Sequence, residues 1–548
     1  MKNIMDFKAK LGCILLALCL VFSLMGCGGP EAEPAPTPSP DTVAPDDTPA
    51  KGGKMGIVMP KKPGSWNPLL ADSREMVDLY SLVYDGLVRF DEQMRPIPAL
   101  ALNWESGDGG TTWQFHLRED VQFHNGRALT ASDVTATLKL LKGYYENSKV
   151  TSRYEGIFDI IDSYSAVDEN TVEIKVKVPG HRVISAMTFP VLPKNYGGIS
   201  TPPAGTGPYT ISDLEKGKTM VLTANGKGWR REPYISTITV TAMPDTATAL
   251  SSLDVNMISL VHSTLLTADH YRQKDLIKVQ SLLTQQYECI VPNVYSSDVS
   301  DKRMRQAILY AIDRSEIISS IYLSNAVVVD VPVTPDSYLY SSTSFTYEYS
   351  LAKAKELLSQ MGFADENDDG FLEKNGKAFT LSILVNENPG ANTRADAARL
   401  IATQLARVGL RAEVNVLSWE KYNSALKAGR FDLALCGYDI GTDFDLSFFL
   451  SGNGRQNFSN FSSSKLNGLL KDYSSAMTES EIKEASLEIQ KYLVEELPVM
   501  SLYFRTNSLV YYEEIKGITL SRDMDVYKAV EQWHIYCQGD DIKAGGSQ

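Results

Sequence analysis

Hydrophobic and polar residues alternate in several short stretches of the chain. Residues 113–117 and 171–176 alternate with a period of two, and residues 54–59 form a short run that ends before Pro60. Such alternation places apolar side chains on one face of a sheet. The pattern therefore predicts a strand at each of these three places.

Other stretches repeat their apolar residues at helical spacing. Ser300 can cap a helix whose apolar face lies within 304–312, and residues 351–361 form a second apolar face that ends at Gly362. Spacings of three and four residues place such side chains on one side of a helix, and a glycine commonly ends it. Two helices are therefore predicted here.

A helix followed by a glycine and a strand indicates the class of fold. Residues 400–408 have a helical face, Gly409 stops it, and residues 410–417 alternate as a strand. Thr478 and Glu481 have the spacing of a capping box at the start of a later helix. Mixed helices and strands throughout the body predict an α/β fold.

The first 27 residues have the pattern of an export signal. Lysines precede an apolar run over 11–25, which is too short to span a membrane comfortably. The run ends in Leu-Met-Gly-Cys, which resembles the bacterial lipobox, so residues 1–26 are expected to be removed and Cys27 to carry lipid. Several acyl chains give stable anchoring. The alternative is a plain secretory signal with a chance cysteine.

A proline-rich segment follows Cys27. Residues 28–53 contain seven prolines and almost no large apolar residue, so residues 27–53 are predicted to form a disordered tether. No other stretch is long and apolar enough for a membrane span. We expect a body tethered by lipid to the outer face of the cytoplasmic membrane.

Composition and charge narrow the classes of function. The chain has 548 residues, 43% of them hydrophobic, and a net charge of −14. An acidic body of this kind is poorly suited to the phosphate backbone, so nucleic-acid binding is not expected. The six cysteines have no zinc-binding spacing.

Catalytic and cofactor motifs in the sequence are absent or incomplete. There is no GxSxG elbow and no HExxH helix, and the triplet at 217–219 only partly matches a P-loop. Residues 365–370 match part of a calcium loop, but position 12 falls on Gly376 instead of glutamate. A polar turn is the favoured interpretation, and neither an enzyme activity nor a cofactor is expected.

Three stretches carry a resemblance to a known family. They read YDGLVRFD over 84–91, PIPALALNW over 96–104 and GTTWQFHLREDVQFHNG over 110–126. Further matches follow in the family's order at 67–69, 205–209, 305–314 and 353–358. The chain is similar, over roughly residues 55–535, to the family 5 extracellular solute-binding proteins of ABC importers.

The resemblance implies a two-lobed α/β fold that closes about a hinge, with an extra subdomain in the first lobe. Residues 84–189 would form the extra subdomain and residues 287–504 the second lobe. The first lobe would take residues 54–83, 190–286 and 505–540. Trp104, Trp113 and Phe115, within the matched motifs, are expected to pack in the core.

The resemblance also implies partners. A peptide or similar small solute would bind between the lobes of a monomer and pass to permease and ATPase subunits. Peptide-binding members hold the ligand by strand-like main-chain hydrogen bonds, and an aspartate pairs with its α-ammonium. Within the class, a nickel chelate, sugar or opine-like ligand is the rival. A sensor without a transport role is another.

Residues 431–446 resemble the segment that carries this aspartate in relatives. Tyr438 replaces the family's usual tryptophan, the proline is missing and one residue is inserted, so Asp439, Asp443 and Asp445 all compete for the role. Asp443 is preferred. A loop of solvated carboxylates is the alternative.

Two tryptophans and two cysteines complete the expectations from the resemblance. Trp419 lies where relatives often place a pocket tryptophan, where it would stack on ligand or pack the lobe, and Trp66 would contribute from the opposite lobe. Cys289 and Cys436 would both lie in the second lobe and in an oxidising compartment. A disulfide between them is predicted.

Overall fold

The structure is a computed structural model that describes residues 48–59, 65–71, 73–147, 152–154, 156–196, 201–215, 218–296, 299–342, 347–388, 392–519 and 521–536. Pro49–Cys537 form one compact unit, which is the subject of everything below. The predicted signal peptide, the lipid-anchor residue Cys27 and most of the predicted tether lie outside the described residues.

One large sheet runs through this unit. Among the described residues it has eleven strands, in the order β18-β17-β19-β12-β20-β11-β1-β10-β9-β8, with β13 beside β20. Their bounds are Arg411–Leu417 (β18), Thr380–Asn386 (β17), Leu433–Asp439 (β19), Ile277–Pro292 (β12), Met500–Tyr512 (β20), Leu260–Ser263 (β11), Gly52–Met59 (β1), Ile235–Ala242 (β10), Thr219–Ala224 (β9), Tyr209–Glu215 (β8) and Ala326–Val328 (β13).

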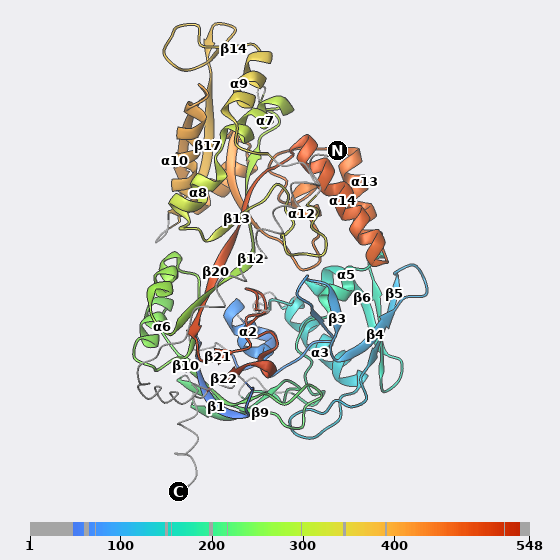
Figure 1. Cartoon of the computed structure of the whole chain (residues 1–548). Coiled ribbons are helices and arrows are strands. Elements are labelled where there is room, and N and C mark those ends of the chain that lie inside the picture. The colour runs from blue at the N-terminus through green and yellow to red at the C-terminus, as the bar shows by residue number, and fades with distance from the viewer. Residues whose placement is uncertain are drawn as a thin grey trace, which may run out of the picture. The chain divides into compact units, whose positions relative to one another are not determined.

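The strands β12 and β20 link the two ends of this sheet. They pair antiparallel from Ile277↔Tyr512 to Ile290↔Met500, with irregular register between Leu283 and Tyr287. On one side of the irregularity β20 pairs with β11, and on the other β12 pairs with β19. Figure 1 shows both strands passing from the elements near α6 to those near β13 and α8. Each lobe therefore uses a part of the same two strands.

A second, four-stranded sheet lies within the region predicted as the extra subdomain. Its order is β4-β5-β7-β6, and a two-stranded ladder β2-β3 precedes it. The bounds are Val88–Phe90 (β2), Pro96–Pro98 (β3), Ala101–Glu105 (β4), Thr112–Leu117 (β5), Ile161–Ala166 (β6) and Thr171–Val176 (β7), with helices Ala131–Glu146 (α3), Ile157–Ile160 (α4) and Arg182–Ala186 (α5).

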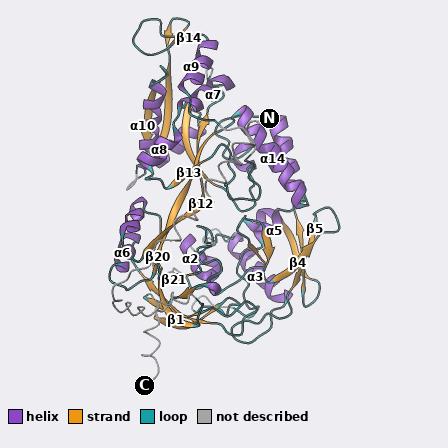
Figure 2. Cartoon of the chain, viewed as in Figure 1, coloured by secondary structure: helices purple, strands orange, loops and turns teal. Residues whose placement is uncertain are grey.

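Helices cover both parts of the large sheet (Figure 2). The ranges predicted for lobe I contain Pro68–Leu70 (η1), Arg74–Ser81 (α2), Thr246–Leu253 (α6), Leu266–Gln273 (η2), Ile515–Lys516 (β21), Val530–Gln532 (η3) and His534–Ile535 (β22). The range predicted for lobe II contains Lys302–Ala311 (α7), Arg314–Ile321 (α8), Leu351–Gln360 (α9), Phe363–Ala364 (β14), Glu373–Lys374 (β15), Lys377–Ala378 (β16), Thr393–Ala406 (α10), Trp419–Lys427 (α11), Ser447–Leu450 (α12), Ser464–Ser475 (α13) and Glu479–Glu496 (α14).

The buried apolar residues divide into two large cores. One contains Ile57, Leu79 and Phe115 from lobe I and its extra sheet, and the other contains Ile308 and Leu433 from lobe II. Each core is a separate source of hydrophobic stabilisation. The α/β class and the two-lobed fold are as predicted, whereas the lobe boundaries stay a prediction.

Most of the elements predicted from local pattern are confirmed. The strands β1, β5, β7 and β18 lie where alternation placed them, and α9 ends just before Gly362. Both hydrogen bonds of the α14 capping box are formed. The Glu481 carboxylate accepts from the backbone N–H of Thr478, and the Thr478 hydroxyl accepts from the backbone N–H of Glu481.

One predicted cap is wrong. Asp301, instead of Ser300, caps α7, because its carboxylate accepts a hydrogen bond from the backbone N–H of Arg303 at 2.9 Å. A carboxylate is also the better group for the positive end of the helix dipole.

Two predictions about loops and core residues hold. Asp365 accepts hydrogen bonds from the backbone N–H groups of Asp369 and Gly370, at 3.1 and 2.9 Å, as a polar turn does. Trp113 and Phe115 are buried, and Trp104 is half-buried.

Gly205 packs against the chain where it enters lobe I. A Cβ at Gly205 would lie 1.9 Å from the Val83 carbonyl oxygen, so no side chain fits there. This explains the glycine in the matched segment 205–209 by close backbone approach.

Candidate functional site

The shared strands are irregular at the point where they pass between the lobes. The Thr284 hydroxyl donates to the Arg505 carbonyl oxygen at 2.8 Å and accepts from the Gln286 backbone N–H at 3.0 Å. The Gln285 carbonyl oxygen accepts from the backbone N–H of Ile440, at 3.0 Å. Bonds of the Thr284 side chain and a backbone bond to the residue after β19 thus take the place of the regular β12–β20 ladder here, which suits a bend between two rigid bodies.

A cavity lies beside this irregularity and takes its walls from both lobes. Its lining includes Gln285 of β12, Ile440 and Phe444 of lobe II, and Arg522 and Met524 near the C-terminus. A recess between two lobes at a hinge is the expected place for a small-molecule site. We take this cavity and the adjoining loop 439–446 as the candidate site.

The loop 439–446 brings two of the predicted aspartates together on a cation. Arg182 of α5 contacts Asp443 Oδ2 through Nε at 2.9 Å and through Nη2 at 2.8 Å. The same Nη2 lies 2.9 Å from Asp445 Oδ2. Burial disfavours the charge of Arg182, but Asp443 and Asp445 outweigh it and raise the pKa of the guanidinium. Two carboxylates thus share one arginine from the extra subdomain.

The backbone of this loop is held in an uncommon conformation. Phe444, between the two aspartates, has a φ of 49°, which side chains of its size rarely adopt. The buried Tyr473 hydroxyl donates to the Asp443 carbonyl oxygen at 2.9 Å, and the Ser447 backbone N–H donates to Asp445 at 3.0 Å. These bonds hold a turn that aims both carboxylates at Arg182.

His181, next to Arg182, extends the same contact. Its Nδ1 lies 2.9 Å from the Ala476 carbonyl oxygen, and its ring meets that of Tyr473 edge-on, with centroids 5.3 Å apart. Burial lowers the pKa of His181, partly opposed by the bond to Ala476 and by Asp443. The imidazole is therefore neutral at neutral pH and donates from Nδ1.

The third candidate aspartate and Tyr438 lie apart from this pair. Asp439 is the last residue of β19, is exposed and lies opposite Gln286 in the ladder. Tyr438 is buried, and its ring stacks on Phe449 with centroids 4.4 Å apart. In this structure Tyr438 packs the lobe beneath the loop.

The two predicted pocket tryptophans do not line the cavity. Trp66 is buried in the core of lobe I, and its neighbour Asn67 donates to Tyr144. Trp419 begins α11, is 60% exposed and stacks on Tyr422. Their predicted ligand contacts stay predictions.

The predicted cysteine pair is adjacent across the sheet. Cys289 of β12 and Cys436 of β19 are direct register partners, and both are buried. The structure has both as free thiols, and the Cys436 Sγ lies 3.2 Å from the Tyr422 hydroxyl. The structure thus differs from the predicted bond, while the strands bring the residues together.

Sequence reasoning missed the cation of the site. Arg182 and His181 lie some 260 positions before Asp443, and no motif marks them. Only the fold brings His181 beside this loop, where Asp443 acts on its pKa. The Arg522–Asp336 ion pair at the cavity wall, at 3.0 Å, was also missed.

Within the described ranges, every helix is too short or too polar to cross a bilayer. In the same ranges, no three or more His, Cys, Asp or Glu side chains are arranged to hold a metal ion.

Comparison with known proteins gives consistent relatives. Residues 95–460 match the family model of the bacterial extracellular solute-binding proteins, family 5 (middle). The oligopeptide-binding protein AppA of Bacillus subtilis is 25% identical, over 88% of this chain and 92% of that protein. The dipeptide-binding protein of Escherichia coli is 26% identical, over 69% of this chain and 74% of that protein. The structure described as a nickel ABC transporter from Bacillus halodurans has a TM-score of 0.78 at 20% identity, over 88% of this chain and 100% of that one.

Proposed function

The chain belongs to the bacterial extracellular solute-binding proteins of family 5, and on that premise we propose that it captures a peptide outside the cell and delivers it to the permease of an ABC importer. Members of this family bind solutes and are not enzymes. Binding and release are the events to explain, with no chemical step.

The observation that carries the proposal is the pair of shared strands. Because β12 and β20 belong to both lobes, a bend at Thr284–Gln286 changes the distance between the lobe surfaces that line the cavity. Closure of this kind surrounds a solute and removes it from water. Docking on the permease would favour the open form and release the solute.

A peptide is the first choice of solute because two similar proteins are named for peptides. An extended peptide can be held by main-chain hydrogen bonds whatever its side chains are. A nickel chelate is the second candidate, since a similar structure is described as a nickel transporter protein.

The anchor for a ligand ammonium stays among the three aspartates. Asp443 and Asp445 are bound to Arg182, so a ligand ammonium would have to displace the guanidinium or add to it. Asp439 is exposed and lies beside the hinge. Exchange of one cation for another at Asp443 would couple ligand binding to the contact between the lobes.

Lipid anchoring at Cys27 is part of the same proposal. The apolar run, the Leu-Met-Gly-Cys sequence and the proline-rich tether support it. A Cys27→Ser variant expressed in a bacterium should appear in the medium or periplasm, while the native chain stays in the membrane fraction. Equal partition of both proteins would contradict anchoring at this residue.

Native mass spectrometry of the purified body tests the solute class. We expect a co-purified peptide, and calorimetry with that peptide and its N-acetylated form then measures the contribution of the ammonium. Loss of at least about tenfold in affinity on acetylation would support an aspartate anchor. Binding of a nickel–histidine chelate but of no peptide would replace the peptide proposal by the nickel one.

A further inference from the structure

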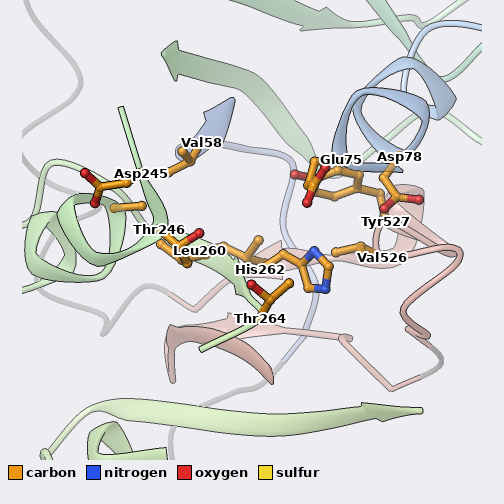
Figure 3. Close-up of a pocket in the computed structure, with 12 residues that line it drawn as sticks. Val58, Glu75, Asp78, Asp245, Thr246, Leu260, His262, Thr264, Val526 and Tyr527 are labelled. Atoms are coloured by element: carbon orange, nitrogen blue, oxygen red, sulfur yellow. The ribbon is translucent and has the colours of Figure 1, made fainter. Parts of the chain in front are cut away.

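Lobe I contains a second recess that the proposed function does not use. Its walls come from β1, α2, α6, β11 and the segment before η3. Figure 3 shows Glu75 and Asp78 of α2 near Tyr527, and His262 of β11 beside Val526. Val58, Leu260 and Val526 supply apolar wall. The recess thus combines carboxylates with an apolar lining.

Asp78 is the unusual group of this recess. It is 3% exposed, and its Oδ2 has no hydrogen-bond partner among the residues that the structure describes. A buried polar atom without a partner is costly and needs an explanation. Burial raises the pKa of Asp78 to about 8, despite the nearby charge of Arg74.

The neighbouring charges are already committed to other partners. His262 Nε2 lies 2.9 Å from Asp523 Oδ1, which makes these two groups a pair of their own. Arg74 donates to Gln285 Oε1 at 3.0 Å. Asp245 lies at the other end of the recess (Figure 3), and it caps α6 by accepting from the Thr248 backbone N–H at 2.7 Å. Asp78 therefore lacks a counter-ion of its own.

We propose that this recess binds an organic cation, an ammonium or guanidinium group on an alkyl chain, with Asp78 as the carboxylate that receives it. The charged end would meet Asp78 and Glu75, and the alkyl chain would lie on the apolar wall. An anionic ligand would be repelled by these carboxylates. A metal ion does not suit the described residues, which contain no suitable cluster.

The chemistry is shared by two sources of cation, a free alkylamine and the lysine or arginine side chain of a bound peptide. The first would make the recess a site of its own, and the second would make it a side-chain pocket of the main solute. The recess is built from residues of lobe I alone. A test of cation binding there can therefore fail without affecting the proposed function, which depends on the cavity at the hinge.

Calorimetry with cadaverine tests the first source. We expect saturable binding to the full mature chain, absent for the neutral analogue pentanediol. Asp78 has to ionise to pair with the cation, and the amine is still protonated near pH 9. Binding should therefore be about tenfold tighter near pH 9 than near pH 7. The other groups around Asp78 are Arg74, Glu75, Tyr154, His262, Asp523, Asp525 and Tyr527.

Matched variants decide the role of Asp78. Asp78→Asn should weaken cadaverine binding at least about tenfold at the higher pH. Asp213→Asn, an exposed carboxylate of β8 away from the recess, should leave it unchanged. Thermal unfolding of each variant shows whether it folds. Glu75→Gln should also weaken cadaverine binding, but less than Asp78→Asn does.

A peptide containing lysine and its norleucine analogue test the second source. Selective weakening of the lysine peptide by Asp78→Asn assigns the recess to the main solute. Cadaverine binding that is equal in Asp78→Asn, or no binding of either probe at millimolar concentration, would overturn the site. Neither result would bear on peptide binding in the cavity at the hinge.

Discussion

The guanidinium of Arg182 and the carboxylate of Asp443 join the extra subdomain to lobe II, with nitrogen–oxygen distances of 2.8 and 2.9 Å to one Oδ2. Both side chains are partly exposed, at 31% and 20%. The pair is therefore weaker than a fully buried one, but Asp445 adds a second carboxylate to the same cation. The contact can hold the lobes together and still be broken.

Substitution of Arg182 should loosen this contact. We expect Arg182→Gln to cost about 1–2 kcal/mol of the free energy that favours closure, because two carboxylates lose their cation. Small-angle scattering should show a larger radius of gyration than in the wild type. Arg399→Gln, which breaks an exposed pair with Asp396 on α10, is the control. Identical scattering of the Arg182 variant and the control would contradict the assigned role.

Gly180 should be equally sensitive for steric reasons. Its φ is 144°, and an added Cβ would lie 1.8 Å from the Ser474 carbonyl oxygen at the end of α13. Gly180→Ala should therefore separate the extra subdomain from lobe II and weaken solute binding at least about tenfold. Gly143→Ala places a Cβ in open space on α3 and should leave binding unchanged. Normal affinity of Gly180→Ala would show that closure does not need this contact.

The buried Asp78 should make the stability of the chain depend on pH. Its pKa is about 8 in the folded chain and 3.8 in the unfolded one, so the folded state binds more protons between these values. The free energy of unfolding should fall as pH rises through this window, by up to about 1.4 kcal/mol per pH unit. Urea unfolding at several pH values measures the slope.

Asp78→Asn isolates that contribution from the other titrating groups. His262 has a raised pKa, since Asp523 outweighs the effect of its burial, and its stabilising effect is also lost as pH rises. The difference between wild type and Asp78→Asn removes the part of the His262 effect that does not depend on Asp78, which itself helps to raise the pKa of His262. The variant should be the more stable protein at about pH 8, and parallel curves for the two proteins would show that Asp78 titrates normally.

The cysteine pair gives a test under oxidising conditions. Cys289 and Cys436 face each other across two neighbouring strands, so a bond between them would close a long loop. If it forms after export, it should stabilise the chain by about 2–4 kcal/mol. Peptide mapping without reductant shows whether the disulfide between Cys289 and Cys436 has formed. Two free thiols in exported protein would agree with the structure and end the disulfide hypothesis.

The parts of the fold that sequence reasoning predicted depend on neighbours along the chain. Alternation over 171–176 and the Thr478–Glu481 box are local signals, and β7 and the start of α14 follow them. Arg182 and Asp443 are 261 positions apart, so their pairing depends on the tertiary fold alone. Asp78 lies on a short helix between Met76 and Leu79, where a carboxylate looks like an ordinary polar position. Its burial arises from β11 and the C-terminal segment, which pack against it later in the chain.

The shared strands also set the order in which the protein can be completed. The first strand of lobe I, β1, begins at Gly52, whereas β20, which lies between β11 and β12, begins only at Met500. Neither part of the large sheet is whole until almost the entire chain is available. Such distant pairings form slowly. In an exported chain of this topology, both parts of the sheet would receive their shared strand β20 only after nearly the whole chain had crossed the translocation channel.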